Sequence, residues 1–416
     1  MRITQRTKRA MIVAASGIGL AALAAGLFVG HAGSTHAAAP SASSPSDISV
    51  QQVMSAAHAH HLGGVIVAGA SNNGGDHKPP AGGPAFNGNP PLIFNGSQGA
   101  ASCQYPLSVA PCFNGNVMMT ASTGPLVVVP IFWTPNGYPM SASYKDLITT
   151  YLGDVAHDSG HTHNVFAVAN EYYGNNGQIQ YNMQLGPVIT DTNTIASDCT
   201  VAANDTTGIY PDGSGYSACV SDALLTAEVD SVTAANNLPH DLSHIYVVYF
   251  PKGVETCFNP GSTTANNACT INHNPTAAFC AYHSADMSNA VYANLSYPIY
   301  HGGASTVHYT CGSDARRAGF GQIESPNGNP DADVEISPTA HEITEATTDP
   351  DTQTGWYDSF GYENGDECAY IYGRTRGAPG AYFNQVINGR NYLTQEMPSN
   401  NLFASSGGTA ACVQGS

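Results

Sequence analysis

The sequence predicts a mixed fold of the α+β or α/β class, in one secreted, disulfide-bonded domain with a mixed sheet and long loops. Two short apolar runs, residues 126–133 and 245–250, are typical of buried strands. Apolar residues recur at helical spacing over residues 144–157, and residues 220–235 are a second predicted helix. Long segments rich in Gly, Asn and Ser separate these elements, which favours strands and helices joined by long loops.

The N-terminal segment has the features of a secretory signal peptide. Basic residues precede position 10, residues 11–30 are apolar, and the small residues at 35–39 suit cleavage by signal peptidase. We therefore expect residues 1–38 to be a signal peptide and the mature protein to be extracellular. The apolar run is also about long enough to span a membrane, so a retained anchor is the alternative.

Composition divides the rest of the chain at about residue 103. Residues 39–102 are rich in Ala, Ser, Gly, Asn and Pro, a composition that buries little apolar surface. They are predicted to be a low-complexity leader or pro-segment. Residues 103–416 have a globular composition and are long enough to bury a large core.

The chain is strongly acidic, with 30 Asp and Glu residues against 12 Lys and Arg residues and a formal net charge of −18. Such a surface repels nucleic acid and anionic lipid. We therefore expect no nucleic-acid partner, and no membrane partner once the signal peptide is removed. The charge suits a soluble secreted protein and also favours the binding of cations.

The 10 cysteines are even in number, and in an exported protein this predicts disulfide bonds. Spacing suggests three pairs without proving any: Cys103 with Cys112, Cys199 with Cys219, and Cys368 with Cys412. No C-x-x-C pair occurs, so a thiolate zinc site is not expected.

The most informative stretch is His341-Glu-Ile-Thr-Glu-Ala-Thr-Thr-Asp-Pro350. It resembles the H-E-x-x-H helix of zinc hydrolases, with Glu345 in place of the second histidine. Residues i and i+4 share a helix face, so His341 and Glu345 could bind one metal ion, with Glu342 beside it as the base. We predict a helix over residues 338–348, capped by Ser337 and ended before Pro350.

A third protein ligand is needed, and acidic residues follow closely. We favour Asp366, with Glu363 as the alternate ligand or as support for a ligand, and Asp349 as a weaker candidate. Asp358 is also close in sequence. One histidine with two carboxylates is a hard ligand set, so calcium or manganese would compete with zinc, the ion expected first.

In such a site Glu342 would deprotonate a metal-bound water, and amide hydrolysis is the reaction that the arrangement serves best. Tyr357, Tyr362 and His283 are candidates to stabilise the oxyanion. The motif also has a purely structural interpretation, because acidic residues early in a capped helix stabilise it.

Two other segments contain possible metal ligands. Asp349-x-Asp351-x-Gln353-x-Gly355 spaces oxygen ligands as a calcium loop does, but we favour an ordinary turn rich in Asp and Gly. His157, His161 and His163 form either a metal-binding group or a polar loop after a helix.

Several segments, in order, resemble the phosphate-induced protein 1 family, which includes the plant EXORDIUM proteins and secreted bacterial relatives. They are Pro130-Ile-Phe-Trp133, residues 245–250, Cys257, residues 279–284, His341-to-Pro350, Gly355-Trp-Tyr-Asp358 and Glu363-Asn-Gly-Asp-Glu-Cys368. The resemblance implies an extracellular protein linked to growth and the cell wall. Its H-E-x-x-E block is similar to the zincin signature and implies a metallopeptidase-like domain using His341, Glu342, Glu345, Glu363 and Asp366, and Asp349 more weakly.

The sequence thus predicts a secreted metal-dependent hydrolase, peptidase-like, acting on an extracellular peptide or protein. The alternative is a non-catalytic protein that binds cell-wall polymer or a partner and holds a structural metal ion such as calcium. The sequence leaves the substrate and the oligomeric state open.

Overall fold

The computed structural model describes residues 112–119, 124–201, 203, 206–259, 269–270, 279–286, 288–298, 300–301, 308–309, 311–313, 322–351, 354–357, 362–402 and 411–415. The chain divides into two compact units, Met1–Ser46 and Asp47–Ser416, and all described residues belong to the second. The predicted signal peptide and leader, residues 1–102, lie outside the described residues.

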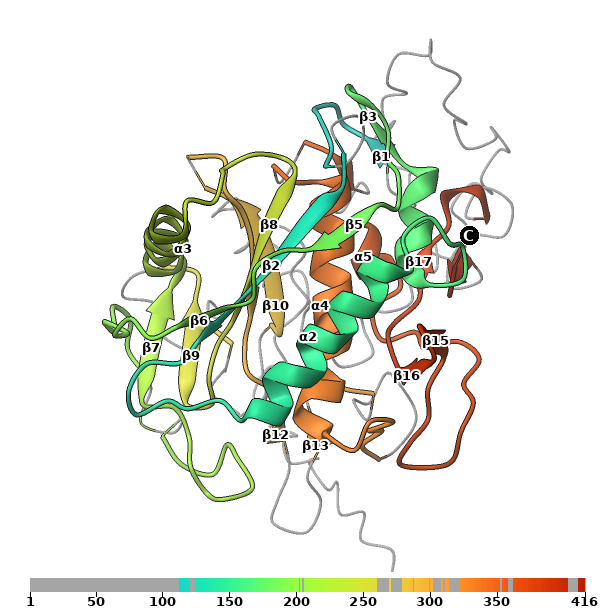
Figure 1. The fold of residues 1–416 in the computed structure, drawn as a ribbon. Helices are drawn as coiled ribbons and strands as arrows, with labels where there is room; N and C mark the ends of the chain where they lie inside the picture. Colours follow the sequence, from blue (N-terminus) through green and yellow to red (C-terminus); the bar gives the residue numbers. More distant parts are fainter. Residues whose placement is uncertain are drawn as a thin grey trace, which may run out of the picture. The chain divides into compact units, whose positions relative to one another are not determined.

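A six-stranded mixed sheet forms the centre of the fold, with its strands in the order β10-β11-β8-β2-β5, and β6 also pairs with β2 (Figure 1). All pairings are parallel except that of β10 with β11. The strands are β2 Leu126–Trp133, β5 Met183–Leu185, β6 Ile189–Asp191, β8 His244–Tyr249, β10 Ala281–Ala285 and β11 Val291–Leu295.

The two predicted buried strands are confirmed as β2 and β8, and both run through the middle of the sheet. A parallel strand covered on both faces needs a nearly continuous apolar sequence, which both segments have. Pro130 is tolerated within β2 because Val128 pairs with Leu185 of β5 whereas Ile131 pairs with Ile189 of β6. The missing amide hydrogen therefore lies where one partner strand gives way to the next.

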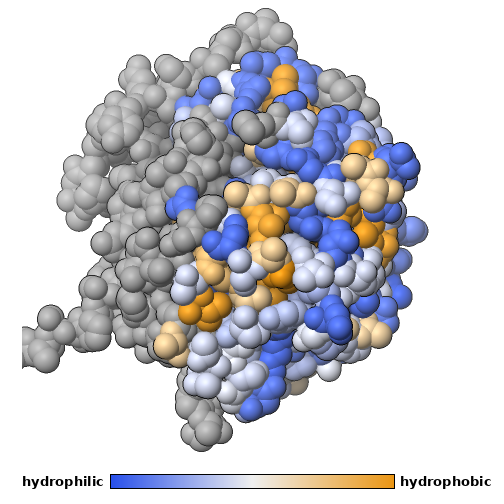
Figure 2. All heavy atoms as spheres, turned by 90° about the vertical axis from the view of Figure 1, so that its left-hand side faces the viewer, coloured by the Kyte–Doolittle hydropathy of each residue, from blue (hydrophilic) through white to orange (hydrophobic). Residues whose placement is uncertain are grey.

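Helices cover both faces of the sheet (Figure 1). Val128, Phe132 and Val247 pack into one apolar cluster with α2 (Ala142–His157) and α4 (Pro330–Thr348). The alternate residues Val129, Ile131 and Val248 face a second cluster with α3 (Asp222–Asn236). Figure 2 shows hydrophobic and hydrophilic residues interspersed on the surface of the molecule on the α3 side.

The predicted helices exist, but all three begin elsewhere, and α2 starts two residues early at Ala142. Residues 220–221 belong to strand β7 (Ala218–Ser221), and α3 starts at Asp222 with Ser221 as its N-cap. The predicted start of α4 at Pro338 is wrong, because the helix begins eight residues earlier at Pro330.

The correct start of α4 has its own sequence signal. Asn329 is the N-cap, Pro330 occupies the first turn, and Asp331 and Asp333 follow as acidic first-turn residues. Pro338 lies inside the helix, where it cannot donate a backbone hydrogen bond. The predicted end is confirmed, since Thr348 is the last helical residue and Asp349 is the C-cap.

Four disulfide bonds lie among the described residues: Cys199–Cys219, Cys257–Cys269, Cys280–Cys311 and Cys368–Cys412. Two of the predicted pairs, Cys199–Cys219 and Cys368–Cys412, are confirmed, and Cys103 lies outside the described residues. These bonds are compatible with an extracellular protein. Within the described part of the chain, no helix is both long and apolar enough to cross a membrane.

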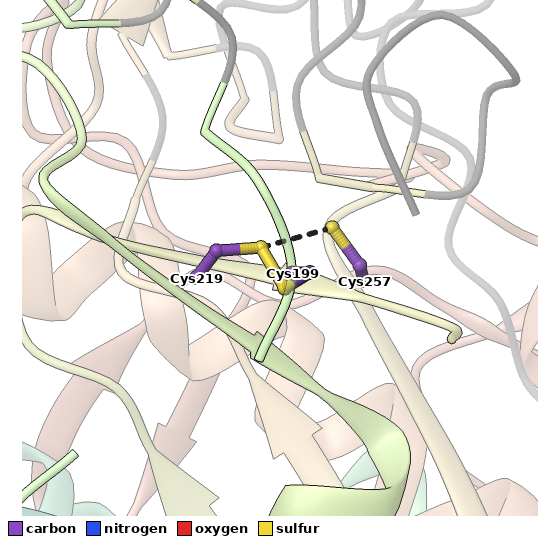
Figure 3. A group of neighbouring side chains, drawn as sticks. All are labelled: Cys199, Cys219 and Cys257. Atoms are coloured by element: carbon purple, nitrogen blue, oxygen red, sulfur yellow. Dashed lines mark hydrogen bonds between the residues drawn. A yellow bond between two sulfur atoms is a disulfide. The ribbon is translucent and has the colours of Figure 1, made fainter. Parts of the chain in front are cut away.

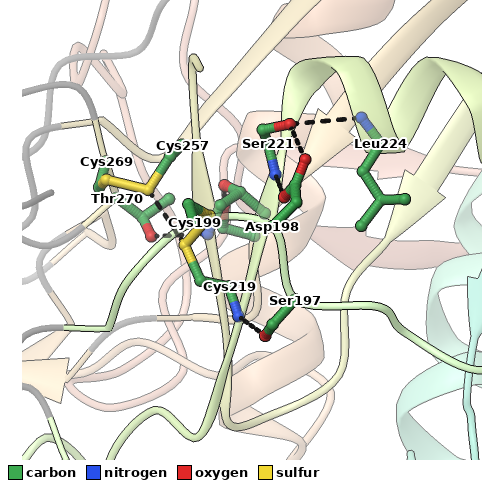
Figure 4. The surroundings of a disulfide bond; sticks show 11 residues. Ser197, Asp198, Cys199, Cys219, Ser221, Leu224, Cys257, Cys269 and Thr270 are labelled. Carbon is green, nitrogen blue, oxygen red and sulfur yellow. Dashed lines mark hydrogen bonds between the residues drawn. A yellow bond between two sulfur atoms is a disulfide. The ribbon is translucent and has the colours of Figure 1, made fainter. Parts of the chain in front are cut away.

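Two of these disulfides touch each other. β7 pairs in parallel with β9 (Val254–Cys257), which brings Cys219 Sγ to 3.3 Å from Cys257 Sγ (Figure 3). The backbone amide of Cys219 donates a hydrogen bond to Ser197 Oγ, and the backbone amide of Ser221 donates one to Asp198 Oδ1 (Figure 4). The loop before β7 is therefore fixed by both covalent and hydrogen bonds.

The remaining elements are short and surround this core. They are β1 Cys112–Phe113 with β14 Trp356–Tyr357, β3 Tyr173–Gly174 with β4 Gly177–Gln178, β12 Tyr300–His301 with β13 His308–Tyr309, β15 Gln385–Ile387 with β16 Arg390–Tyr392, β17 Met397–Pro398 with β18 Cys412–Val413, η1 Val165–Glu171 and α5 Asn364–Glu367.

Candidate metal centre

Helix α4 places the H-E-x-x-E motif in the interior of the molecule. Ala340, Ile343 and Ala346 pack into the apolar cluster between the helix and the sheet. His341, Glu342 and Glu345 have no exposed surface, and His283 of the edge strand β10 is equally buried beside them. Buried ionisable groups are costly unless they are paired, protonated or bound to a metal ion.

The side chain of His341 has a defined tautomer. Gln395 donates a hydrogen bond from Nε2 to the carbonyl of Gly365 at 2.7 Å, so its oxygen is turned towards His341. Gln395 Oε1 lies 3.1 Å from His341 Nδ1, which must therefore carry the hydrogen. The other nitrogen, Nε2, lies 2.9 Å from Glu345 Oε2 and 3.6 Å from Asp366 Oδ1.

His283 is oriented in the same manner. Its Nε2 lies 2.9 Å from the backbone carbonyl of Asp349, an acceptor only, so Nε2 carries the hydrogen. Its Nδ1 then faces Glu342 Oε2 at 3.3 Å and Glu345 Oε2 at 3.9 Å. Ligand atoms of His283, Glu342 and Glu345 all lie within 4.8 Å of one another. Glu363 is also close, with Oε2 3.5 Å from His283 Nε2.

The acidic segment after the motif folds back over α4, as the sequence predicts. Glu363 and Asp366 form a capping box around α5, and the amide of Asp366 donates to Glu345 Oε1 at 2.8 Å. Gly365 allows this close approach, because a Cβ there would lie 2.8 Å from Glu345 Oε1. The Cys368–Cys412 disulfide anchors the end of the segment.

Burial and mutual repulsion shift the pKa values of this group. Burial raises the pKa of Glu345 to about 7, and it raises the pKa values of Glu342 and Glu363 well above their usual range. Burial also lowers the pKa of His283 to about 4. Burial alone would also lower the pKa of His341, but the charge of Glu345 and the interaction with Asp366 outweigh burial and raise that pKa.

The structure thus brings together all of the ligand candidates that the sequence favoured. His341, Glu345, Asp366 and Glu363 converge, with Glu342 beside them. The weaker candidate Asp349 contributes its backbone carbonyl to His283, while its Oδ1 accepts a hydrogen bond from the Gly355 amide at 3.0 Å. Asp358 lies outside the described residues.

The candidates for oxyanion stabilisation have different positions. Tyr362 packs into the apolar cluster on the α3 side of the sheet, and Tyr357 pairs with Cys112 between β14 and β1. His283 instead lies at the centre of the ionisable group. No spacing rule connects His283 or Gln395 to the motif, because each comes from a separate segment that only the tertiary fold brings to α4.

The structure describes only part of the possible calcium loop after α4, and its two aspartates have different hydrogen-bond partners. Asp349 Oδ1 accepts from Gly355, whereas Asp351 Oδ2 accepts from Asn116 at 3.1 Å. Gln353 lies outside the described residues.

Comparison with known proteins adds no further assignment. No family model, no curated protein and no solved structure matches this chain. Inferences about its function therefore depend on the site itself.

Proposed function

We propose that the protein is an exported, metal-dependent hydrolase whose centre holds one divalent cation between His341, Glu345 and His283, with Asp366 as a further ligand. The observation that carries this proposal is the orientation of the two imidazoles. Each has one nitrogen hydrogen-bonded to a carbonyl oxygen, so each turns its other nitrogen towards carboxylates. Such an arrangement is repulsive unless a proton or a cation lies between the atoms.

Geometry favours a cation over shared protons. Among the described residues, His341 Nε2, Glu342 Oε1 and Glu345 Oε2 are fully buried and form no hydrogen bond of acceptable geometry, although His341 Nε2 lies 2.9 Å from Glu345 Oε2. Histidine ligands typically donate their second N–H to a carbonyl or carboxylate, which is the arrangement of both His283 and His341 here. Two imidazoles and carboxylates suit zinc, so His283 makes the site softer than sequence reasoning expected.

Glu342 is the residue we assign as the general base. It follows the ligand His341 directly, and its Oε2 lies 3.3 Å from His283 Nδ1. A divalent ion bound here would lower the pKa of a water molecule and polarise a carbonyl. Glu342 would accept the proton, and an extracellular peptide or protein amide is the substrate class that we propose. Membership of the EXORDIUM-like family, with its cell-wall link, is part of the same proposal.

Metal analysis combined with one substitution tests this function. Protein purified without chelator is expected to contain close to one equivalent of zinc. Glu342→Gln should keep that metal but lose hydrolysis of a peptide library by at least about 100-fold, the usual contribution of a general base. Glu228→Gln on α3 is the matched control and should leave both unchanged. A content of less than about a tenth of an equivalent of any divalent metal per protein chain would exclude the proposal.

The complete burial of the site favours a second candidate, in which the ion is structural and the protein binds a cell-wall polymer or a partner. His283, His341, Glu342 and Glu345 all have no exposed surface. Chelation would then lower the melting temperature, while neither the wild type nor Glu342→Gln would hydrolyse any peptide. Hydrolysis that the wild type shows and Glu342→Gln lacks would rule out this alternative.

A further inference from the structure

A second group of metal-ligating side chains lies at the C-terminal end of α2. Asp158 is the C-cap of that helix, and His161 and His163 follow in the loop that the sequence marks as histidine-rich. Ligand atoms of these three residues lie within 4.8 Å of one another. His161 Nδ1 is 2.8 Å from Asp158 Oδ1, and His163 Nε2 is 3.2 Å from Asp158 Oδ2.

Buried groups hold the carboxylate of Asp158 in place. Its side chain is only 7% exposed, and Asn164 donates to its Oδ2 from Nδ2. Asn164 is itself fully buried and also donates to the hydroxyl of Tyr181 at 3.1 Å. A ligand whose position is fixed by buried neighbours is typical of built metal sites.

The loop that carries the two histidines is confined as well. Asn164 is the N-cap of η1, where its Oδ1 accepts from the amide of Phe166 at 3.0 Å. At the other side, Gly415 lies so close that an added Cβ would be 2.3 Å from the carbonyl of Thr162, the residue between the histidines. Because the backbone is already restricted, little conformational entropy remains to be lost on binding an ion.

The electrostatic setting favours a cation. The C-terminal end of a helix carries partial negative charge, so the carboxylate of Asp158 at the end of α2 is unfavourable without a positive partner. The side chains of His161 and His163 are 62% and 55% exposed, which leaves them accessible to a hydrated ion. Their ring centroids are 5.5 Å apart.

We propose that Asp158, His161 and His163 form a second metal site, for a borderline divalent transition-metal ion such as Zn²⁺, Ni²⁺ or Cu²⁺. Two imidazole nitrogens and one carboxylate oxygen match these ions better than Ca²⁺ or Mg²⁺, which take oxygen ligands. Water would complete the coordination on the exposed side. The site shares no residue with the candidate metal centre on α4, which we call the α4 centre. His157, which the sequence groups with His161 and His163, lies in the last turn of α2 and is not part of this site.

Zinc chloride titration of the full chain, purified without chelator and followed with a competing indicator dye, tests this site. The wild type should bind one more exchangeable equivalent of zinc than H161Q/H163Q does, or should bind that equivalent at least tenfold more tightly than the variant. His244→Gln is the matched control, because His244 Nδ1 makes the same 2.8 Å contact with Asp241 and, among the described residues, that carboxylate pairs with one imidazole only. It should titrate as the wild type does.

Equal zinc uptake by the wild type and H161Q/H163Q would overturn the proposal and would mean that the imidazoles only hydrogen-bond to Asp158. Zinc should also shift the ring proton resonances of His161 and His163 in NMR spectra, and unshifted resonances would count equally against it. His341→Gln separates the two sites. It should lose the tightly held metal of the α4 centre and keep the labile equivalent, so failure at one site is visible without failure at the other.

Discussion

Gln395 determines which nitrogen of His341 faces the carboxylates, because its side-chain oxygen lies 3.1 Å from Nδ1 and its side-chain nitrogen donates to the Gly365 carbonyl. Gln395→Leu removes that acceptor and leaves both tautomers of His341 available. Loss of such a supporting contact typically lowers metal affinity by about 10- to 100-fold. Competition with a chelator of known affinity measures the change. Gln414→Leu, which removes hydrogen bonds to Tyr372 and Arg374 carbonyls, is the control and should keep wild-type affinity.

His283 separates our ligand set from the set expected from sequence alone. If His283 Nδ1 binds the ion, His283→Gln should reduce the bound metal to below about a tenth of an equivalent and abolish the stabilisation by zinc. Elemental analysis and thermal melts with and without chelator provide the measurement. Full metal content in His283→Gln would show that His283 is not a ligand, and the ligand set would then be His341, Glu345 and Asp366.

Gly365 tests the close contact between α5 and α4. In Gly365→Ala the new Cβ would lie 2.8 Å from Glu345 Oε1 and 3.0 Å from His341 Cγ, so α5 must move away. We expect a loss of about 1–3 kcal/mol in the free energy of unfolding, together with weaker metal binding. Gly153→Ala in α2 is the control, because its nearest neighbour is Leu185 Cδ2 at 3.7 Å and a helical alanine is favourable. Equal stability of the two variants would contradict the tight fit.

The stability of the metal-free protein should fall as the pH rises from 6.5 to 8. The raised pKa values of Glu345, about 7, and of His341 mean that the folded state holds protons more tightly than the unfolded state. Their contribution is present at low pH and is lost as the pH rises through those values. His283, with its pKa lowered to about 4, acts in the opposite direction, but only below its usual value of 6.5.

Denaturant unfolding at pH 6.5 and pH 8, with chelator and with zinc, checks this dependence. Zinc competes with protons for the same atoms, so its stabilising effect should grow over the same interval. A metal-free protein that is more stable at pH 8 would show that these groups are not the protonated cluster that burial predicts.

The contact between two disulfides predicts an exchange of partners. Cys199→Ser frees the thiol of Cys219, which lies 3.3 Å from Cys257 Sγ. Its thiolate can attack Cys257 and release Cys269 as a thiolate, forming a Cys219–Cys257 bond without any net oxidation. Peptide mapping under non-reducing conditions identifies the bond. Cys368→Ser is the control, because among the described residues the contact that Cys412 Sγ makes beyond its own disulfide is with the Glu367 carbonyl at 4.0 Å and not with another sulfur. An intact Cys257–Cys269 bond in Cys199→Ser would refute the exchange.

Local sequence signals predicted much of the fold and most of the candidate site, the motif on α4 together with Glu363 and Asp366. The apolar runs of β2 and β8, the end of α4 at Asp349 and the return of the acidic segment all follow from short-range pattern. The start of α4 did not, because Ser337 and Pro338 imitate an N-terminus that Asn329 and Pro330 actually form. Ser337 Oγ instead accepts a hydrogen bond from the backbone amide of Gln395 at 3.0 Å.

The contributions of His283 and Gln395 could not be predicted in this way. His283 lies on β10, which reaches α4 only because the sheet places that strand at its edge, antiparallel to β11. Gln395 comes from the segment after β16. A lone histidine or glutamine in such a segment has no local pattern that distinguishes a ligand or its support from an ordinary core residue.

The disulfides beside the candidate metal centre bear on when it could be filled. Cys280, bonded to Cys311, lies three residues before His283, and Cys368, bonded to Cys412, lies two residues after Asp366. The segments that bring His283 and Asp366 to α4 are thus each covalently fixed next to the proposed ligand. In a reducing compartment these disulfides would not form, and neither segment would be fixed. The disulfides would therefore form first during maturation, and metal uptake would follow. Metal content would then report whether a preparation has completed its oxidative folding.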